Sequence, residues 1–99
     1  MAVISLSDCT VYDDTLSSSL KQIVIVTPAT SDDGDTIAVP LKNYGMKTIL
    51  SIFGCAHSTE DSIVVTEAPT TSVTTGTLTI TIGGSTDNLK RAYVIRGVC

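Results

Sequence analysis

The chain has 99 residues and a net charge of −4, with ten Asp and Glu against six Lys and Arg. A chain of this length forms one domain and buries roughly 60–65% of its unfolded surface in a single core. That core must be aliphatic, because the chain has no Trp, one Phe and three Tyr. The acidic balance repels phosphate backbones and few rings are present to stack on bases, so nucleic acid is not an expected partner.

The cysteine set and the N-terminus indicate where the chain folds. Cys9, Cys55 and Cys99 are an odd number without a CxxC pair, which predicts three free thiols and folding in a cytoplasm. The first seven residues lack the basic start of a signal peptide. No apolar run approaches the roughly 20 residues that cross a bilayer, so a membrane partner is not expected either.

Residues 1–22 are weakly patterned and are predicted to form an N-terminal arm or a short strand-and-turn segment. Val3, Ile4 and Leu6 supply the apolar side chains of this arm. Such a segment can bind a partner by adding a strand to an exposed sheet edge, so these three residues are the predicted partner-binding residues. Further on, residues 13–20 carry two acids before a serine run; the acids favour a turn of helix there, whereas the three serines disfavour it.

Residues 23–99 are predicted to form a β-sandwich domain. Short apolar or alternating runs recur about every ten residues, separated by Gly, Pro and Asp clusters. This spacing is typical of an all-β fold, either an antiparallel β-sandwich or a small barrel of six to seven strands. The expected strands are residues 23–27, 36–39, 47–53, 63–66, 76–82 and 91–96. The first of these is apolar on both faces, which suits a strand covered on two sides, either in the middle of a sandwich or beneath an assembly contact.

The strand at residues 47–53 is expected to point Leu50 and Ile52 toward one face and Ile49 and Phe53 toward the other, and to end at Gly54. Residues 70–75 are expected to be a polar connection. The predicted core residues within the strands are Ile25, Leu50, Ile52, Leu78, Ile80 and Ile95.

The strand at residues 76–82 alternates apolar residues with Thr77, Thr79 and Thr81. Threonine arrays occur on ice-binding proteins, but there they repeat over many strands. No neighbouring segment is expected to continue the array here, so ordinary β-propensity explains it.

Two small clusters are candidates for chemistry. Asp32, Asp33 and Asp35 surround a glycine, but their spacing differs from that of a calcium loop and no glutamate follows in range. Cys55 and His57 provide one thiol and one imidazole, which do not complete a zinc site or a catalytic set. The sequence therefore predicts no enzyme activity, no metal site and no cofactor. Lys90 and Arg91 are expected on the surface, where they either contact an acidic partner or, as is more common, keep a strand edge from pairing with other chains.

Residues 35–97 resemble the small β-rich structural proteins of tailed bacteriophage virions. The likeness is carried by the strand after the Asp-Gly turn, by the closing Tyr-Val-Ile-Arg-Gly strand, and by the segments 44–47, 68–71 and 77–82. The resemblance implies a capsid decoration, cement or minor capsid protein, made in the host cytoplasm and carried on the virion. It implies the major capsid protein or another virion protein as partner, and a homo-oligomer or multi-copy assembly, but no functional residues.

Two other classes of function stay open from the sequence. A calcium-stabilised adhesion or binding module would use the loop around Asp32, and its melting temperature would rise with added calcium. An enzyme or enzyme subunit would need a pocket with convergent polar groups, which the sequence does not indicate.

Overall fold

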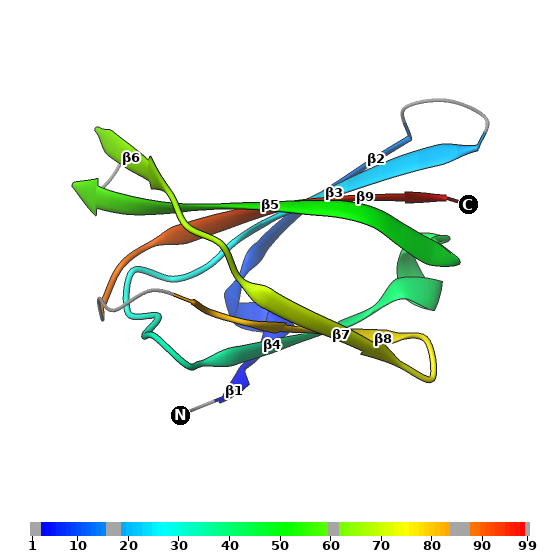
Figure 1. Cartoon of the computed structure of the whole chain (residues 1–99), viewed down its shortest axis with the longest axis horizontal. Helices are drawn as coiled ribbons and strands as arrows, with labels where there is room; N and C mark the ends of the chain where they lie inside the picture. Colours follow the sequence, from blue (N-terminus) through cyan, green and yellow to red (C-terminus); the bar gives the residue numbers. More distant parts are fainter. Residues whose placement is uncertain (1–2, 16–18, 60–61, 84–87, 99) are drawn as a thin grey trace.

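The computed structural model describes residues 3–15, 19–59, 62–83 and 88–98. Two β-sheets pack face to face (Figure 1), which confirms the predicted all-β sandwich. One sheet has the strand order β1-β4-β8-β7 and the other β2-β3-β9-β5-β6. The strands in the described residues are β1 (Val3–Ile4), β2 (Thr10–Thr15), β3 (Leu20–Val26), β4 (Thr36–Pro40), β5 (Thr48–Thr59), β6 (Ile63–Thr66), β7 (Thr70–Thr74), β8 (Thr77–Thr81) and β9 (Arg91–Val98).

Hairpins join β2 to β3, β5 to β6 and β7 to β8, whereas the chain crosses between sheets after β1, β3, β4, β6 and β8. The β7–β8 turn consists of Thr75 and Gly76, both with positive φ (52° and 76°). This geometry suits a two-residue hairpin. Two short 3-10 helices, η1 (Leu6–Asp8) and η2 (Leu41–Tyr44), lie in the connections. In the described part of the chain, no helix is long and apolar enough to cross a membrane.

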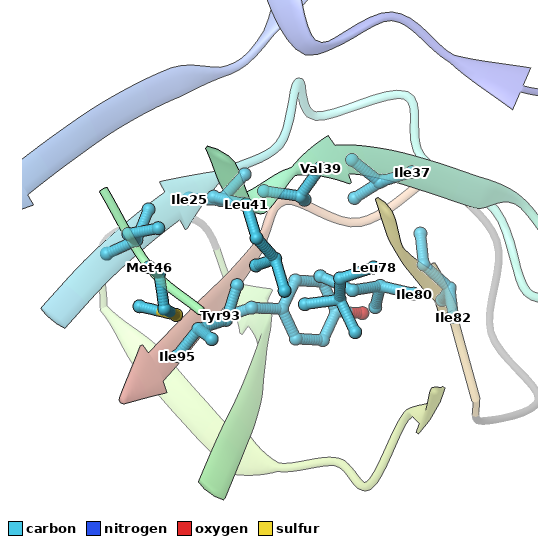
Figure 2. Packing of buried hydrophobic residues seen from close by; sticks show 11 residues of the cluster. Ile25, Ile37, Val39, Leu41, Met46, Leu78, Ile80, Ile82, Tyr93 and Ile95 are labelled. Atoms are coloured by element: carbon cyan, nitrogen blue, oxygen red, sulfur yellow. The ribbon is translucent and has the colours of Figure 1, made fainter. Parts of the chain in front are cut away.

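The core lies between the sheets and is built from the inward side chains of alternating strand positions (Figure 2). Ile25, Leu78, Ile80 and Ile95 are fully buried, as predicted, and Ile52 packs against them while partly buried. The other buried members of the cluster are Ile23, Ile37, Val39, Leu41, Met46, Ile82 and Tyr93.

Leu50 was expected in the core, and that prediction is wrong. Its side chain is 63% exposed, while Ile49 and Ile52 both pack against the core. The cause is a β-bulge in β5: Ile49 pairs with Gly97 and Ser51 with Arg96, so Leu50 is an extra residue without a partner on β9. A bulge shifts the alternation of side chains by one position, which brings Ile49 to the core side together with Ile52. Phe53 lies on the face opposite Ile52, as expected, and is exposed.

The N-terminal segment is part of both sheets. β2 pairs with β3 from Thr10 opposite Val26 to Thr15 opposite Lys21, so the expected helical turn is wrong for residues 13–15, and its residues 16–18 lie outside the described part. The boundary expected after residue 22 falls inside β3. β1 adds to the other sheet, parallel to β4.

Two further expectations about strands are corrected. β5 continues past Gly54 to Thr59, where it pairs with β6 and β9. Gly54 is a point of close contact and not a turn, since a Cβ there would lie 2.5 Å from the Glu67 carbonyl oxygen and 2.9 Å from the Tyr93 ring. The polar connection at residues 70–75 contains strand β7. It continues the hydroxyl array, with cross-strand pairs Thr70–Thr81, Ser72–Thr79 and Thr74–Thr77.

Candidate functional site

The outer face of the five-stranded sheet carries a straight row of apolar side chains across four strands. Tyr12 on β2 pairs with Val24 on β3, Val24 with Val94 on β9, and Val94 with Phe53 on β5. Side chains alternate along a strand, and the neighbours Ile23, Ile25, Tyr93 and Ile95 fill the core, so this row points away from it. Tyr12 is 60% and Phe53 55% exposed. We call Tyr12, Val24, Val94 and Phe53 the outer-face row.

The outer-face row has uncharged side chains along one side and polar side chains along the other. Val26, Ala92 and Cys55 occupy the next cross-strand line, where they are half-buried. On the opposite side, the Arg96 guanidinium donates to the Gln22 side-chain oxygen at 3.0 Å. The arrangement is an apolar strip that is bordered by polar side chains on one side, a feature that it shares with the rim of a protein-binding surface.

A shallow hollow lies at each end of the row. One lies beside Phe53 and Val94 and is also lined by Ser51, Ile52 and Arg96. The other lies beside Tyr12 and is also lined by Asp8, Thr10, Val26, Thr27, Pro28, Ala29 and Lys90. Each exposed ring therefore stands next to a depression that a partner side chain can enter.

Sequence reasoning missed the outer-face row. It identified residues 23–27 as apolar on both faces, but Tyr12 lies in a segment expected to be an arm. Phe53 was expected on the face opposite Ile52, but nothing in the sequence aligned it with Tyr12. The row becomes visible only when the register of the paired strands is known, because this register aligns four residues from four distant segments.

Cys55 and His57 lie two positions apart on β5 and therefore point to the same, outer face. Both are half-buried. Within residues 3–15, 19–59, 62–83 and 88–98, no group of three or more His, Cys, Asp or Glu side chains is placed to hold a metal ion.

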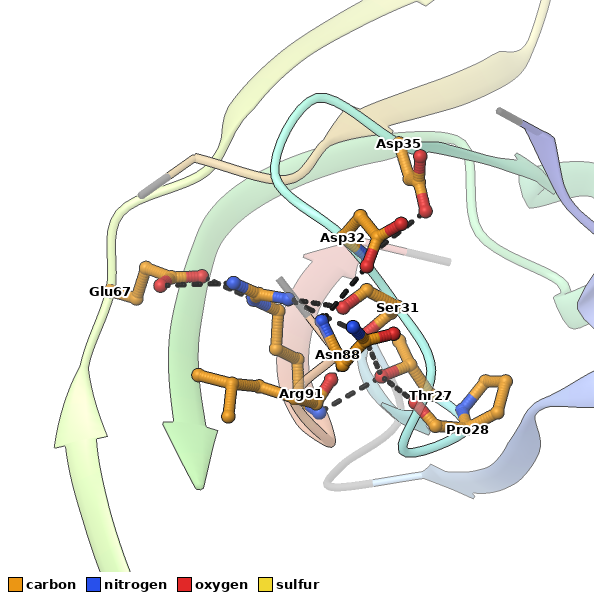
Figure 3. Close-up of polar contacts among 9 residues, drawn as sticks. Thr27, Pro28, Ser31, Asp32, Asp35, Glu67, Asn88 and Arg91 are labelled. Atoms are coloured by element: carbon orange, nitrogen blue, oxygen red, sulfur yellow. Dashed lines mark hydrogen bonds and ion pairs between the residues drawn. The ribbon is translucent and has the colours of Figure 1, made fainter. Parts of the chain in front are cut away.

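The Asp32 loop uses two of its carboxylates to hold main-chain amides (Figure 3). The Asn88 N–H donates to Asp32 Oδ1 at 2.8 Å, and the Asp32 N–H donates to Asp35 Oδ2 at 3.0 Å. Asp35 is buried. These contacts close the loop between β3 and β4 against the start of β9, which is a structural role.

Arg91 was expected on the surface, and that prediction is wrong. Its side chain is fully buried at the end of the sandwich, where Nε donates to Glu67 Oε1 at 2.6 Å and Nη1 donates to the Ser31 carbonyl at 2.8 Å (Figure 3). The Arg91 main-chain N–H also donates to Thr27 Oγ1 at 2.9 Å. The Arg91 side chain thus ties the start of β9 to the β3–β4 and β6–β7 connections. A buried guanidinium needs such partners because desolvation without them is costly.

Among the described residues, the pKa values of the Cys9 thiol and the Tyr93 hydroxyl are shifted. Burial, together with the negative charge of Asp8, raises the pKa of the Cys9 thiol. Burial also raises the pKa of Tyr93, whose hydroxyl has no hydrogen-bond partner among the described residues. Cys9 and Cys55 are both free thiols, and Cys99 lies outside the described residues. Neither perturbed group lies in the outer-face row.

The predicted partner-binding residues of the N-terminus are divided between core and surface. Ile4 and Leu6 are partly buried and pack against the core, whereas Val3 is exposed. Val3 pairs with Thr36 at the edge of the four-stranded sheet. Only Val3 is thus available to a partner without rearrangement.

The chain matches no protein-family model, no curated protein and no solved structure in the comparisons with known proteins.

Proposed function

We propose that this chain is a non-enzymatic accessory protein that docks on a larger protein assembly through the outer face of its five-stranded sheet. The observation that carries the proposal is the outer-face row. Exposed apolar side chains in a continuous patch with a polar rim mark protein-binding surfaces.

The composition of the row suits a protein partner. Large aromatic side chains contribute most to binding energy at protein interfaces, particularly when they fill pockets in the partner. Tyr12 and Phe53 are such anchors at the two ends, and Val24 and Val94 form a flat apolar bridge between them. The partner surface that fits is itself apolar at its centre and supplies side chains for the two hollows.

The structural role of the polar side chains at the end of the sandwich supports a non-enzymatic function. Asp32, Asp35, Glu67 and Arg91 hold the connections of the sandwich together. The contacts described above join them to main-chain groups and to one another. They serve the fold and leave the outer face apolar.

The resemblance to phage virion proteins suggests which assembly and which partner the chain binds. The assembly is then a phage head, the partner its major capsid protein, and the chain a decoration or cement protein present in many copies on the virion. A small interface repeated over a closed shell holds through multivalency, so no single strong site is needed. The N-terminal contribution narrows to Val3, since Ile4 and Leu6 already pack against the core.

The test is cosedimentation of the purified chain with isolated heads of the phage that encodes it. Wild-type protein should pellet with the heads and reach a saturating ratio to the shell protein. Tyr12→Ser and Phe53→Ser should each lower the affinity at least tenfold, because aromatic anchors at interfaces contribute about 2 kcal/mol or more.

The matched control is Val73→Ser, which removes a comparably exposed apolar side chain from the other sheet. It should bind like wild type. Val3→Asp tests the N-terminal contribution without disturbing the core. Loss of binding by Val3→Asp alone, with both ring variants binding normally, would move the docking site from the outer face to the N-terminus.

A further inference from the structure

Strand β6 is an exposed sheet edge with no charge on it. It is the last strand of the five-stranded sheet and pairs only with β5 among the described strands. Its four residues, Ile63, Val64, Val65 and Thr66, are all exposed. Natural proteins protect sheet edges with charges, proline or bulges, because unpaired main-chain groups are templates for another strand.

The opposite edge of the same sheet is protected in this way. β2 carries Asp13 and Asp14 in its second half, and Asp13 is ion-paired with Lys21 at 2.9 Å. Carboxylates on an edge oppose pairing with another acidic chain. The two edges of this sheet thus differ, and of the two, β6 is the one suited to self-association.

The hydrogen-bond pattern shows which groups of β6 point outward. The Glu67 N–H donates to the Gly54 carbonyl at 3.0 Å, which makes Gly54 and Glu67 a hydrogen-bonded pair. Pairs alternate along an antiparallel ladder, so Val65 bonds to Ala56 on β5. The N–H and C=O groups of Val64 and Thr66 then point away from β5, at the open edge.

We propose that two copies of this chain pair through β6, antiparallel and about a two-fold axis at Val65. Val65 of each copy lies opposite Val65 of the other, and Val64 lies opposite Thr66 of the second copy. In this register the four outward N–H groups of the two strands all find outward carbonyls. The five-stranded sheets join into one continuous sheet of ten strands.

The register follows from the main-chain groups. Self-pairing of identical strands about a two-fold axis is antiparallel and isologous. Centring the axis on Val64 would place Thr66 opposite Ser62, whose N–H is already bonded to the Thr59 carbonyl at 3.0 Å. That register offers fewer bonds. Centring on Val65 also brings two valines into a close, non-hydrogen-bonded pair that covers part of their exposed surface.

The dimer has a consequence for binding. A two-fold axis perpendicular to the joined sheet leaves the outer faces of both copies on the same side. Two outer-face rows are then presented together to one partner surface, which raises avidity without new contacts. The pairing itself does not depend on the docking role and can be tested in its absence. Edges of four residues bury much less than the roughly 1,600 Å² of a standard interface, so the dimer is weak and concentration-dependent.

The experiment is analytical ultracentrifugation of the full chain from about 10 μM to about 1 mM, the range in which weak association is visible. Wild-type protein should change from a 10.3 kDa monomer toward twice that mass. Val65→Lys places two like charges opposite each other at the axis and should keep the protein monomeric. Val73→Lys is the matched control, since Val73 is 47% and Val65 46% exposed on edge strands of different sheets, and it should dimerise like wild type.

A second variant separates loss of the dimer from loss of folding. Val64→Pro removes an outward N–H without breaking a bond to β5, and should weaken the dimer at least tenfold while the circular dichroism spectrum keeps its β form. The register is tested by oxidation in a chain whose three natural cysteines are replaced by serine. Val65→Cys should form an intermolecular disulfide, since non-hydrogen-bonded pairs have Cα atoms about 4.5 Å apart, and Val64→Cys should not.

A wild-type protein that stays monomeric at about 1 mM, or a dimer that survives Val65→Lys, would overturn the proposal. A dimer lost in Phe53→Ser but kept in Val65→Lys would assign self-association to the outer face instead. Loss of the dimer in Val73→Lys as well would show that the edge chosen here is wrong.

Discussion

Tyr93→Phe is expected to stabilise the protein, which is unusual for a change at a fully buried position. The Tyr93 ring is completely buried in the core, and its hydroxyl has no hydrogen-bond partner among the described residues. An unsatisfied buried hydroxyl costs about 1–3 kcal/mol. Phenylalanine keeps the ring and removes that cost, so the free energy of unfolding should rise by about 1 kcal/mol or more at pH 7. In a domain of this size this corresponds to a rise in Tm of roughly 4–8 °C.

The effect of the same substitution should increase at alkaline pH. Burial raises the pKa of Tyr93 in the folded protein, while in the unfolded chain a tyrosine titrates near pH 10. Below about pH 10 both states hold the proton, and the pH has no effect through this group. Above it the unfolded state loses its proton first, so wild-type stability falls by up to about 1.4 kcal/mol per pH unit.

The measurement is urea denaturation of wild type and Tyr93→Phe at pH 7 and pH 11. Both proteins share every other residue, so the difference between them isolates Tyr93. The advantage of Tyr93→Phe should grow by about 1 kcal/mol between the two pH values. A variant less stable than wild type at pH 7 would show that the hydroxyl is hydrogen-bonded, and a difference independent of pH would refute the raised pKa.

Three further predictions follow from burial and charge. Ile80→Ala should lower the free energy of unfolding by about 2–5 kcal/mol, whereas Leu50→Ala, at an exposed bulge position, should change it by less than about 0.5 kcal/mol; equal losses in urea denaturation would refute the bulge. Glu67→Ala leaves Arg91 buried without its carboxylate and should cost about 3–5 kcal/mol, measured in the same way, and a cost below about 1 kcal/mol would mean that Arg91 is solvated. Cys9 should react with iodoacetamide more slowly at pH 8 than in the urea-unfolded chain, because its raised pKa leaves less thiolate; equal rates by mass spectrometry would contradict its burial.

The sequence predicts the sandwich because its strongest signals are local. Alternation around Ile80 and the apolar run containing Ile25 require only that a strand has one face in the core, and both residues are buried. Leu50 was misplaced because a bulge depends on pairing with β9, which no local pattern reports. Strand β7 was missed because its residues are mostly Thr and Ser, and its strand conformation comes from pairing with β8.

The candidate site was harder to predict for the same reason. Tyr12 and Phe53 are 41 positions apart in the sequence, and neither is distinctive where it stands. Only the register of β2, β3, β9 and β5 brings them onto one line. Burial of Arg91 likewise depends on Glu67, which reaches it from the connection after β6.

The number of copies of this chain per purified phage head, counted by quantitative mass spectrometry in wild type and in Phe53→Ser, tests the central claim most directly. The account predicts a fixed ratio to the shell protein in wild type and a loss of at least tenfold in Phe53→Ser, with folded protein still present in the infected cells. Absence of the wild-type chain from the particle would contradict the assembly role. Equal copy numbers in the two would contradict docking through the outer face.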